Sequence, residues 1–149
     1  MTQPSTPPPP APINMHKQKL YSLILGGVTL VGMILPWASM NMGFGSRSMG
    51  NGFSGWGILC LFGLVAVIVS SLAGDKMQDY DQNMKYLAIG GFAAITLGAF
   101  IYFMQISGGG MGQKSGIGVW FCTIAGTLGL LWVTGIIKFP PSRPTPPGV

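Results

Sequence analysis

The chain has 149 residues, with eight Lys or Arg, three Asp or Glu and a formal net charge of +5 at pH 7. Charged residues make up only 7% of it, against about 25% in ordinary soluble domains, and apolar residues reach 48%. So few charges cannot cover a water-soluble globule, and two Cys are too few for a disulfide-built secreted domain. These exclusions leave a small all-α integral membrane protein as the expected class.

Two Pro-rich segments, residues 1–16 and 139–149, lie at the ends of the sequence. They hold eleven of its 12 prolines and almost nothing that a core could bury, which predicts disordered cytoplasmic tails. Each contains a PxxP spacing, Pro4–Pro7 and Pro141–Pro144, that an aromatic-lined groove could bind as polyproline II. A plain spacer is the simpler interpretation of both tails.

Residues 17–138 are expected to form one transmembrane domain of four helices. Four apolar runs of 18 or 21 residues, none with Asp, Glu, Lys, Arg or His, lie at 20–37, 56–73, 86–106 and 117–137. About 20 residues at 1.5 Å rise cross a hydrocarbon core roughly 30 Å thick. Glycines inside the runs are tolerated in membrane helices, where neighbours pack closely. The sequence therefore predicts a four-transmembrane-helix bundle.

A cleaved signal peptide is the alternative for the first run, because basic residues precede it. The run is longer than a usual signal core, and it ends in Leu35-Pro36-Trp37 without a small-residue cleavage pattern. Both features favour a helix that stays in the protein.

Basic residues are distributed unevenly around the predicted spans. Six lie on one side and two on the other, and such a bias marks the cytoplasmic side. We therefore expect a multi-pass protein of a bacterial inner membrane with both termini cytoplasmic. The six are Lys17, Lys19, Lys76, Lys85, Lys138 and Arg143, and the two outer residues are Arg47 and Lys114.

Aromatic residues lie near the ends of the runs, as in the interfacial belts of membrane proteins. Trp37, Trp56 and Trp120 are expected at the outer interface. Tyr21 and Tyr86 are expected at the inner one.

The first two runs resemble the last two. YSLILGG and VTLVG in the first run match KYLAIGG and FAAITLG around the third, and Cys60 and Cys122 follow at almost equal depth. This similarity favours a duplicated helical hairpin, although Gly-rich membrane helices also resemble each other by composition alone. Equal depth makes a Cys60–Cys122 disulfide geometrically possible, but buried free thiols are the commoner case.

Two patterns point to metal chemistry, and both have simpler interpretations. Met residues of the outer loops could bind Cu(I), but the only His lies on the opposite side and no ligand spacing converges. Residues 79–83 (DYDQN) resemble the start of a calcium loop, but Met84 and Gly90 stand where Gly and a bidentate Glu are required. We expect these acids to cap the third helix instead, with no metal and no cofactor.

Catalytic and nucleic-acid-binding motifs are missing from the sequence. His16 borders a tail, and the four runs contain no titratable carboxylate, Lys or His, which predicts neither an enzyme nor a proton-coupled pump. The net charge of +5 is explained by orientation and predicts no nucleic-acid partner. The expected partners are the lipid bilayer and other protein chains.

Small residues recur every four positions in the last two runs. The candidate packing residues are Gly90, Ala94 and Gly98 in the third run and Gly118, Cys122 and Gly126 in the fourth. This spacing places each set on one helix face, where backbones can approach closely. Self-association or docking of a protein partner is the functional interpretation, and packing within one bundle is the simpler one.

The sequence Leu35-Pro36-Trp37, the Gly-rich outer loop, Ser54-Gly55-Trp56-Gly57 and the GIGVW that opens the fourth run resemble small uncharacterised bacterial four-helix membrane proteins. The resemblance covers residues 17–138 and implies no activity. Residues 55–60 also resemble claudin-like tetraspans, which have a longer first outer loop with a Cys pair, so no claudin residue is carried over.

We therefore expect an accessory or scaffolding subunit of a membrane complex. The alternative is a small channel or transporter component with an uncharged path between the helices. Hydroxyl side chains would have to line such a path, and the candidates are Ser70, Ser71, Thr96, Thr123, Thr127 and Thr134.

Overall fold

A computed structural model describes residues 15–108 and 113–137. Within these residues the chain forms four helices, as predicted, and three short strands, which were not predicted. The helices are α1 (Lys17–Ile34), α2 (Gly57–Leu72), α3 (Gln82–Gly108) and α4 (Ile117–Val133). The strands are β1 (Ala38–Met42), β2 (Gly45–Gly50) and β3 (Gln113–Ser115). The Pro-rich tails lie outside the described residues, apart from Met15 and His16.

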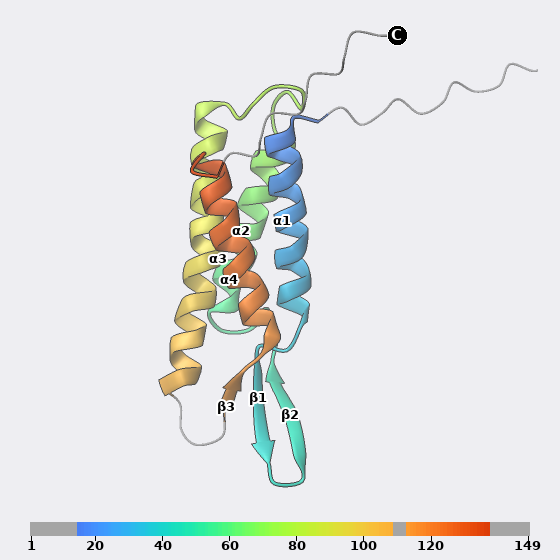
Figure 1. The fold of residues 1–149 in the computed structure, drawn as a ribbon, viewed down its shortest axis with the longest axis vertical. Coiled ribbons are helices and arrows are strands. Elements are labelled where there is room, and N and C mark those ends of the chain that lie inside the picture. Colours follow the sequence, from blue (N-terminus) through green and yellow to red (C-terminus); the bar gives the residue numbers. More distant parts are fainter. Residues whose placement is uncertain (1–14, 109–112, 138–149) are drawn as a thin grey trace, which may run out of the picture.

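The four helices lie side by side, and each contacts two neighbours (Figure 1). α3 packs between α2 and α4, and α1 closes the arrangement by packing on α4 and α2. The start of α1, the end of α4 and the α2–α3 connection are at one end, and the strands extend from the other (Figure 1). We call these the loop end and the sheet end.

By length and composition, α3 is the one helix in the described part of the chain that could cross a membrane. Among the described helices, only α3 is long and apolar enough to cross a bilayer, with 27 residues and a mean hydropathy of 2.0 over its 18-residue window. α2 and α4 are apolar but shorter, at 16 and 17 residues. Four helices are therefore present, and four spans remain a proposal.

Local chemistry explains why three helices differ from the apolar runs. α1 ends before Pro36, because the residue before a proline avoids helical geometry, and Leu35 is extended with ψ 155°. α4 ends in a Schellman turn: Gly135 has φ +79°, and the N–H of Ile136 donates to the carbonyl of Leu131. α3 starts earlier than its apolar run, at Gln82, whose N–H donates to the Asp81 carboxylate at 3.0 Å.

The strands form one antiparallel sheet in the order β2-β1-β3. Met40 on β1 is opposite Arg47 on β2 and Gln113 on β3, so these three residues share a face. Backbone bonds around Trp37 join the sheet to the helices: its N–H donates to Gly50, and its carbonyl accepts from Gly116. Segments interpreted as outer loops are thus partly a sheet, which links the two halves of the chain.

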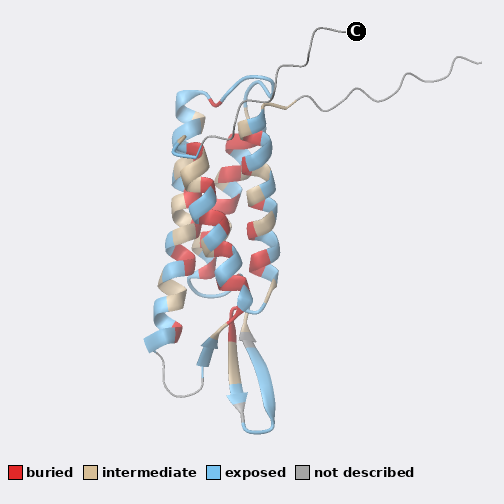
Figure 2. Cartoon of the chain, in the orientation of Figure 1, coloured by how far each residue is buried: buried red, intermediate tan, exposed pale blue. Residues whose placement is uncertain are grey.

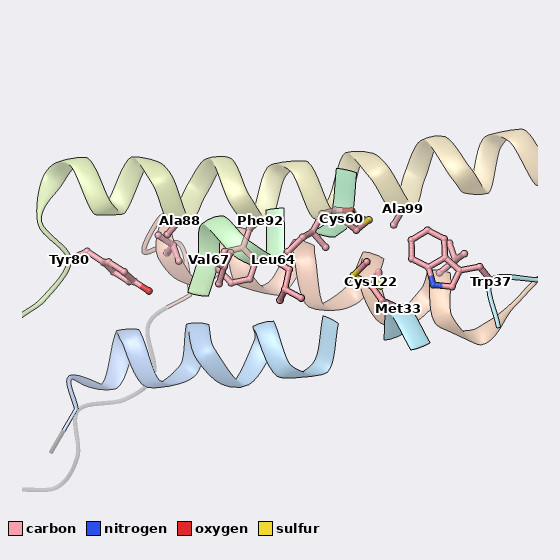
Figure 3. Packing of buried hydrophobic residues seen from close by; sticks show 13 residues of the cluster. Met33, Trp37, Cys60, Leu64, Val67, Tyr80, Ala88, Phe92, Ala99 and Cys122 are labelled. Atoms are coloured by element: carbon pink, nitrogen blue, oxygen red, sulfur yellow. Dashed lines mark hydrogen bonds between the residues drawn. The ribbon is translucent and has the colours of Figure 1, made fainter. Parts of the chain in front are cut away.

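A single row of buried side chains runs between the helices, from Tyr80 at the loop end to Trp37 at the sheet end (Figure 3). Buried and exposed residues alternate along all four helices (Figure 2). The buried set mixes Phe92, Ile95 and Val67 with small and hydroxyl residues. Fully buried Ser22, Thr29, Ser70 and Ser71 belong to it.

Candidate functional site: the helix seams and the bundle ends

The contact between α2 and α3, here called the α2–α3 seam, is built on facing glycines. A Cβ on Gly63 would meet the carbonyl oxygen of Gly91, and one on Gly91 would lie 2.7 Å from the carbonyl oxygen of Gly63. Neither position can hold a side chain without separating the helices. The two backbones therefore touch, because neither glycine places a side chain between them.

A thiol–glycine contact occurs in this seam and again between α1 and α4, here called the α1–α4 seam. A Cβ on Gly98 would lie 2.9 Å from Cys60 Sγ, and one on Gly32 would lie 2.9 Å from Cys122 Sγ. The Cys60 thiol donates to the carbonyl of Ile95 at 3.3 Å. In the same way, the Cys122 thiol donates to Thr29 at 3.6 Å.

The two thiol–glycine contacts match residue by residue. Each accepting carbonyl lies three residues before the glycine, and each glycine also approaches the carbonyl four residues before the cysteine. Both cysteines are buried and free. The structure therefore has two separate thiols and not the Cys60–Cys122 disulfide that the sequence allowed. The two halves of the chain therefore use the same local packing against each other.

The helix contact within each half pairs a glycine with a larger residue, but the helix that carries the glycine differs between the two halves. In the α1–α2 pair, a Cβ on Gly26 would lie 3.5 Å from Leu64 Cδ1 and 3.7 Å from Val67 Cγ1. In the α3–α4 pair, Gly129 faces the ring of Phe92. Gly26 and Phe92 are separated by the same number of residues as Gly32 and Gly98. Val67 and Gly129 are separated by the same number as Cys60 and Cys122.

The structure separates the six candidate packing residues. Gly98, Gly118, Cys122 and Gly126 are buried: Gly98 against α2, Gly118 and Cys122 against α1, and Gly126 against Ile95 and Thr96 of α3. Ala94 is half-buried. Gly90 is exposed, and a Cβ there would meet nothing within 4 Å. Of the adjacent glycines Gly90 and Gly91, the buried one is Gly91, which shares with Gly98 the face of α3 that contacts α2.

The sequence predicted Trp37 at the outer interface with Trp56 and Trp120. In the structure, Trp37 is instead fully buried at the sheet end. Its indole N–H donates to the carbonyl of Gly32 at 2.9 Å, and its ring meets Tyr102 edge-on at 5.0 Å. Gly52 and Gly118 leave room for the ring. Trp37 therefore closes this end of the bundle. Trp56 and Trp120 are exposed, as are Tyr21 and Tyr86.

The loop end contains a buried lysine that the sequence alone did not distinguish from a surface charge. Lys19 is 2% exposed, and its Nζ donates to the carbonyl of Asp75 at 2.8 Å and lies 5.6 Å from the centre of the Tyr80 ring. The Tyr80 hydroxyl in turn bonds Ser71 at 2.9 Å. These contacts fix the start of α1 against the α2–α3 connection, beside a cavity of about 380 Å³.

The three aspartates of the α2–α3 connection have separate roles. Asp81 precedes α3 and caps it, as expected, whereas the Asp79 carboxylate accepts from the N–H of Tyr80 and lies 3.8 Å from His16 Nδ1. The Asp75 carboxylate accepts from the N–H of Met77. Within the described part of the chain, no three His, Cys, Asp or Glu residues gather as metal ligands would.

No protein family, curated protein or solved structure matches this chain. Its function must therefore be argued from its own residues.

Proposed function

We propose that this protein is a four-span integral membrane protein that acts as an accessory or scaffolding subunit. One observation carries the proposal: the helices are more apolar outside than inside. Serine, threonine and glycine occupy much of the interior, while large apolar side chains point outward on every helix. Examples from α1 to α4 are Ile24, Phe62, Leu97 and Ile124, which are 52%, 68%, 55% and 55% exposed.

Water is a poor solvent for such a surface. Soluble monomers rarely expose contiguous apolar patches above roughly 300–600 Å². Exposed large apolar residues occur on all four helices, so a single partner would cover only part of them. A bilayer would cover all of them at once.

The short helices fit this placement when their flanks are included. The 17 residues of α4 rise about 26 Å, and exposed Ile136 and Ile137 extend the apolar surface beyond its last turn. Trp56 and Trp120 lie near the sheet end and Tyr86 near the loop end, as expected for belts at two interfaces. A span shorter than the hydrocarbon core costs only a fraction of a kcal/mol per Å of mismatch.

The repeated thiol–glycine contacts support a duplicated hairpin. Two halves that derive from one ancestral hairpin would keep equivalent contacts, and Cys60–Gly98 and Cys122–Gly32 are equivalent in register and in partner atoms. Reversed volumes at Gly26 and Phe92 are compatible with this origin, because a change at one residue of a contact is compensated by its partner.

A scaffolding role is favoured over a water-lined path by the hydroxyl groups. Thr96, Thr123 and Thr127 each donate to the carbonyl four residues earlier in their own helix. Ser70 and Ser71 are buried, whereas Thr127 and Thr134 are exposed, so these side chains do not form one stripe. The buried seams also leave the outward faces free for other membrane chains.

Reporter fusions test the membrane placement. Fusions at Gln82 and Thr145 should be active on the cytoplasmic side, and a fusion at Asn51 should be active outside. The protein should also stay in the membrane pellet after an alkaline carbonate wash. An outside signal at Gln82 or Thr145, or release by carbonate, would contradict the proposal.

Copurification tests the scaffolding role. Extraction of the full chain in a mild detergent should recover a membrane protein in fixed stoichiometry. Disruption of that complex by Leu97→Ser, with the thermal stability of the chain unchanged, would mark an outward face as the docking surface. Recovery of this protein alone from gently solubilised membranes would contradict a subunit role.

A further inference from the structure

A groove runs between α1 and α4 at the loop end. Its floor is almost wholly apolar, and its volume is about 330 Å³. At its side, the rings of Tyr21 and Trp132 meet edge-on at 5.0 Å, and the Trp132 indole N–H donates to the carbonyl of Gln18 at 3.3 Å. The lining residues are Tyr21, Ile24, Leu25, Leu128, Trp132 and Ile137.

A basic residue, Lys17, lies one turn before the groove on α1. Lys17, the first residue of α1, is exposed and precedes Tyr21 by four positions and Ile24 by seven, so all three lie on one helix face. Lys19, two residues further on, is turned inward to Asp75 instead. The groove lining contains no acidic residue. The α1–α4 groove therefore combines an apolar slot with positive charge at one end.

We propose that the α1–α4 groove binds one anionic phospholipid. An acyl chain fits the apolar floor, the amphipathic rings of Tyr21 and Trp132 suit the glycerol level, and Lys17 attracts the phosphate. This proposal rests on the proposed bilayer placement, which puts the groove at the leaflet that is rich in anionic lipid. A lysine near such a surface favours an anionic over a zwitterionic headgroup by about fivefold.

Native mass spectrometry of the detergent-solubilised full chain tests the site. Phosphatidylglycerol and phosphatidylcholine of identical acyl chains are added at equal concentration, and the first bound lipid is quantified. We expect phosphatidylglycerol to be favoured by about fivefold, and Lys17→Gln to abolish that preference. The matched control is Lys85→Gln, which removes an exposed lysine from the first turn of α3 and should keep the preference.

A second pair of variants tests the groove itself. Leu128→Trp fills the slot and should reduce binding of the first phosphatidylglycerol at least threefold. Leu97→Trp places the same bulk on the outward face of α3 and should leave binding unchanged. Equal retention of the two lipids, or equal effects of the paired variants, would show ordinary lipid contact around the bundle and overturn the site. Carbonate release of the protein from membranes would instead contradict the bilayer placement.

Discussion

The two hairpins of this protein, α1–α2 and α3–α4, solve the same packing problem with opposite residues. The first places a small residue on its leading helix, Gly26, against Val67. The second places Phe92 on its leading helix against Gly129. Between the hairpins, by contrast, both seams use one arrangement, a cysteine thiol over a glycine. One contact between the halves therefore has the same residue types in both seams, while the equivalent contact within each half pairs a glycine with a larger residue in the opposite order.

Phe92 should be the most sensitive position in this comparison. Its side chain is fully buried and fills the space that Gly129 leaves open, so Phe92→Ala should lower the free energy of unfolding by about 3–5 kcal/mol. The measurement is reversible unfolding in detergent or bicelles. Phe62→Ala is the control, since Phe62 is 68% exposed and packs little. Equal costs for the two variants would refute the reversed-volume interpretation.

Gly126→Leu should have the next largest effect. A Cβ at Gly126 would lie 3.1 Å from both Ile95 Cγ2 and the backbone nitrogen of Thr96, so a larger side chain must push α3 away. We expect a cost of roughly 1–3 kcal/mol in the same assay.

Gly90→Leu is the matched control for Gly126→Leu. Gly90 shares the sequence pattern but faces open space, so its replacement should change stability by less than about 0.5 kcal/mol. A large loss of stability for Gly90→Leu, without dissociation of a complex, would contradict the assignment of Gly90 to the outward face of α3.

The smallest effects, and the sharpest test of equivalence, concern Gly32→Ala and Gly98→Ala. Each new Cβ would lie 2.9 Å from a thiol sulfur, so each should cost about 1–2 kcal/mol, with a difference of less than about 0.5 kcal/mol. Removal of the facing sulfur, by Cys122→Ala or Cys60→Ala, should recover part of each loss. Costs that differ severalfold, or no recovery, would argue against equivalent seams.

Four helices could be predicted from the sequence because uncharged apolar runs of helix length leave few alternatives. The Asp81 cap was also predictable, since it depends on local spacing. The buried glycine face of α3 could not be predicted from the sequence. Gly90 and Gly91 are adjacent, and only the position of α2 decides which one is buried.

Long-range contacts explain the remaining differences. Trp37 is buried where Gly52 and Gly118 leave room for its ring, and Lys19 is buried where its ammonium donates a hydrogen bond to the carbonyl of Asp75 in the α2–α3 connection. The strands consist of Gly, Ser, Met, Asn and other residues with little strand preference. Their pairing depends on the backbone of Trp37, which contacts both outer segments.

Site-directed labelling tests the central claim, that lipid covers the apolar outer surface, most directly. The background chain carries Cys60→Ala and Cys122→Ala, and single cysteines are introduced as Phe44→Cys, Asp79→Cys or Ile124→Cys. Intact cells are then treated with a membrane-impermeant maleimide. Phe44, at the exposed β1–β2 turn, should label from outside, and Asp79 should label only after lysis. Ile124 should resist labelling in both cases, although it is 55% exposed. Labelling at Ile124 as fast as at Phe44 would contradict the account.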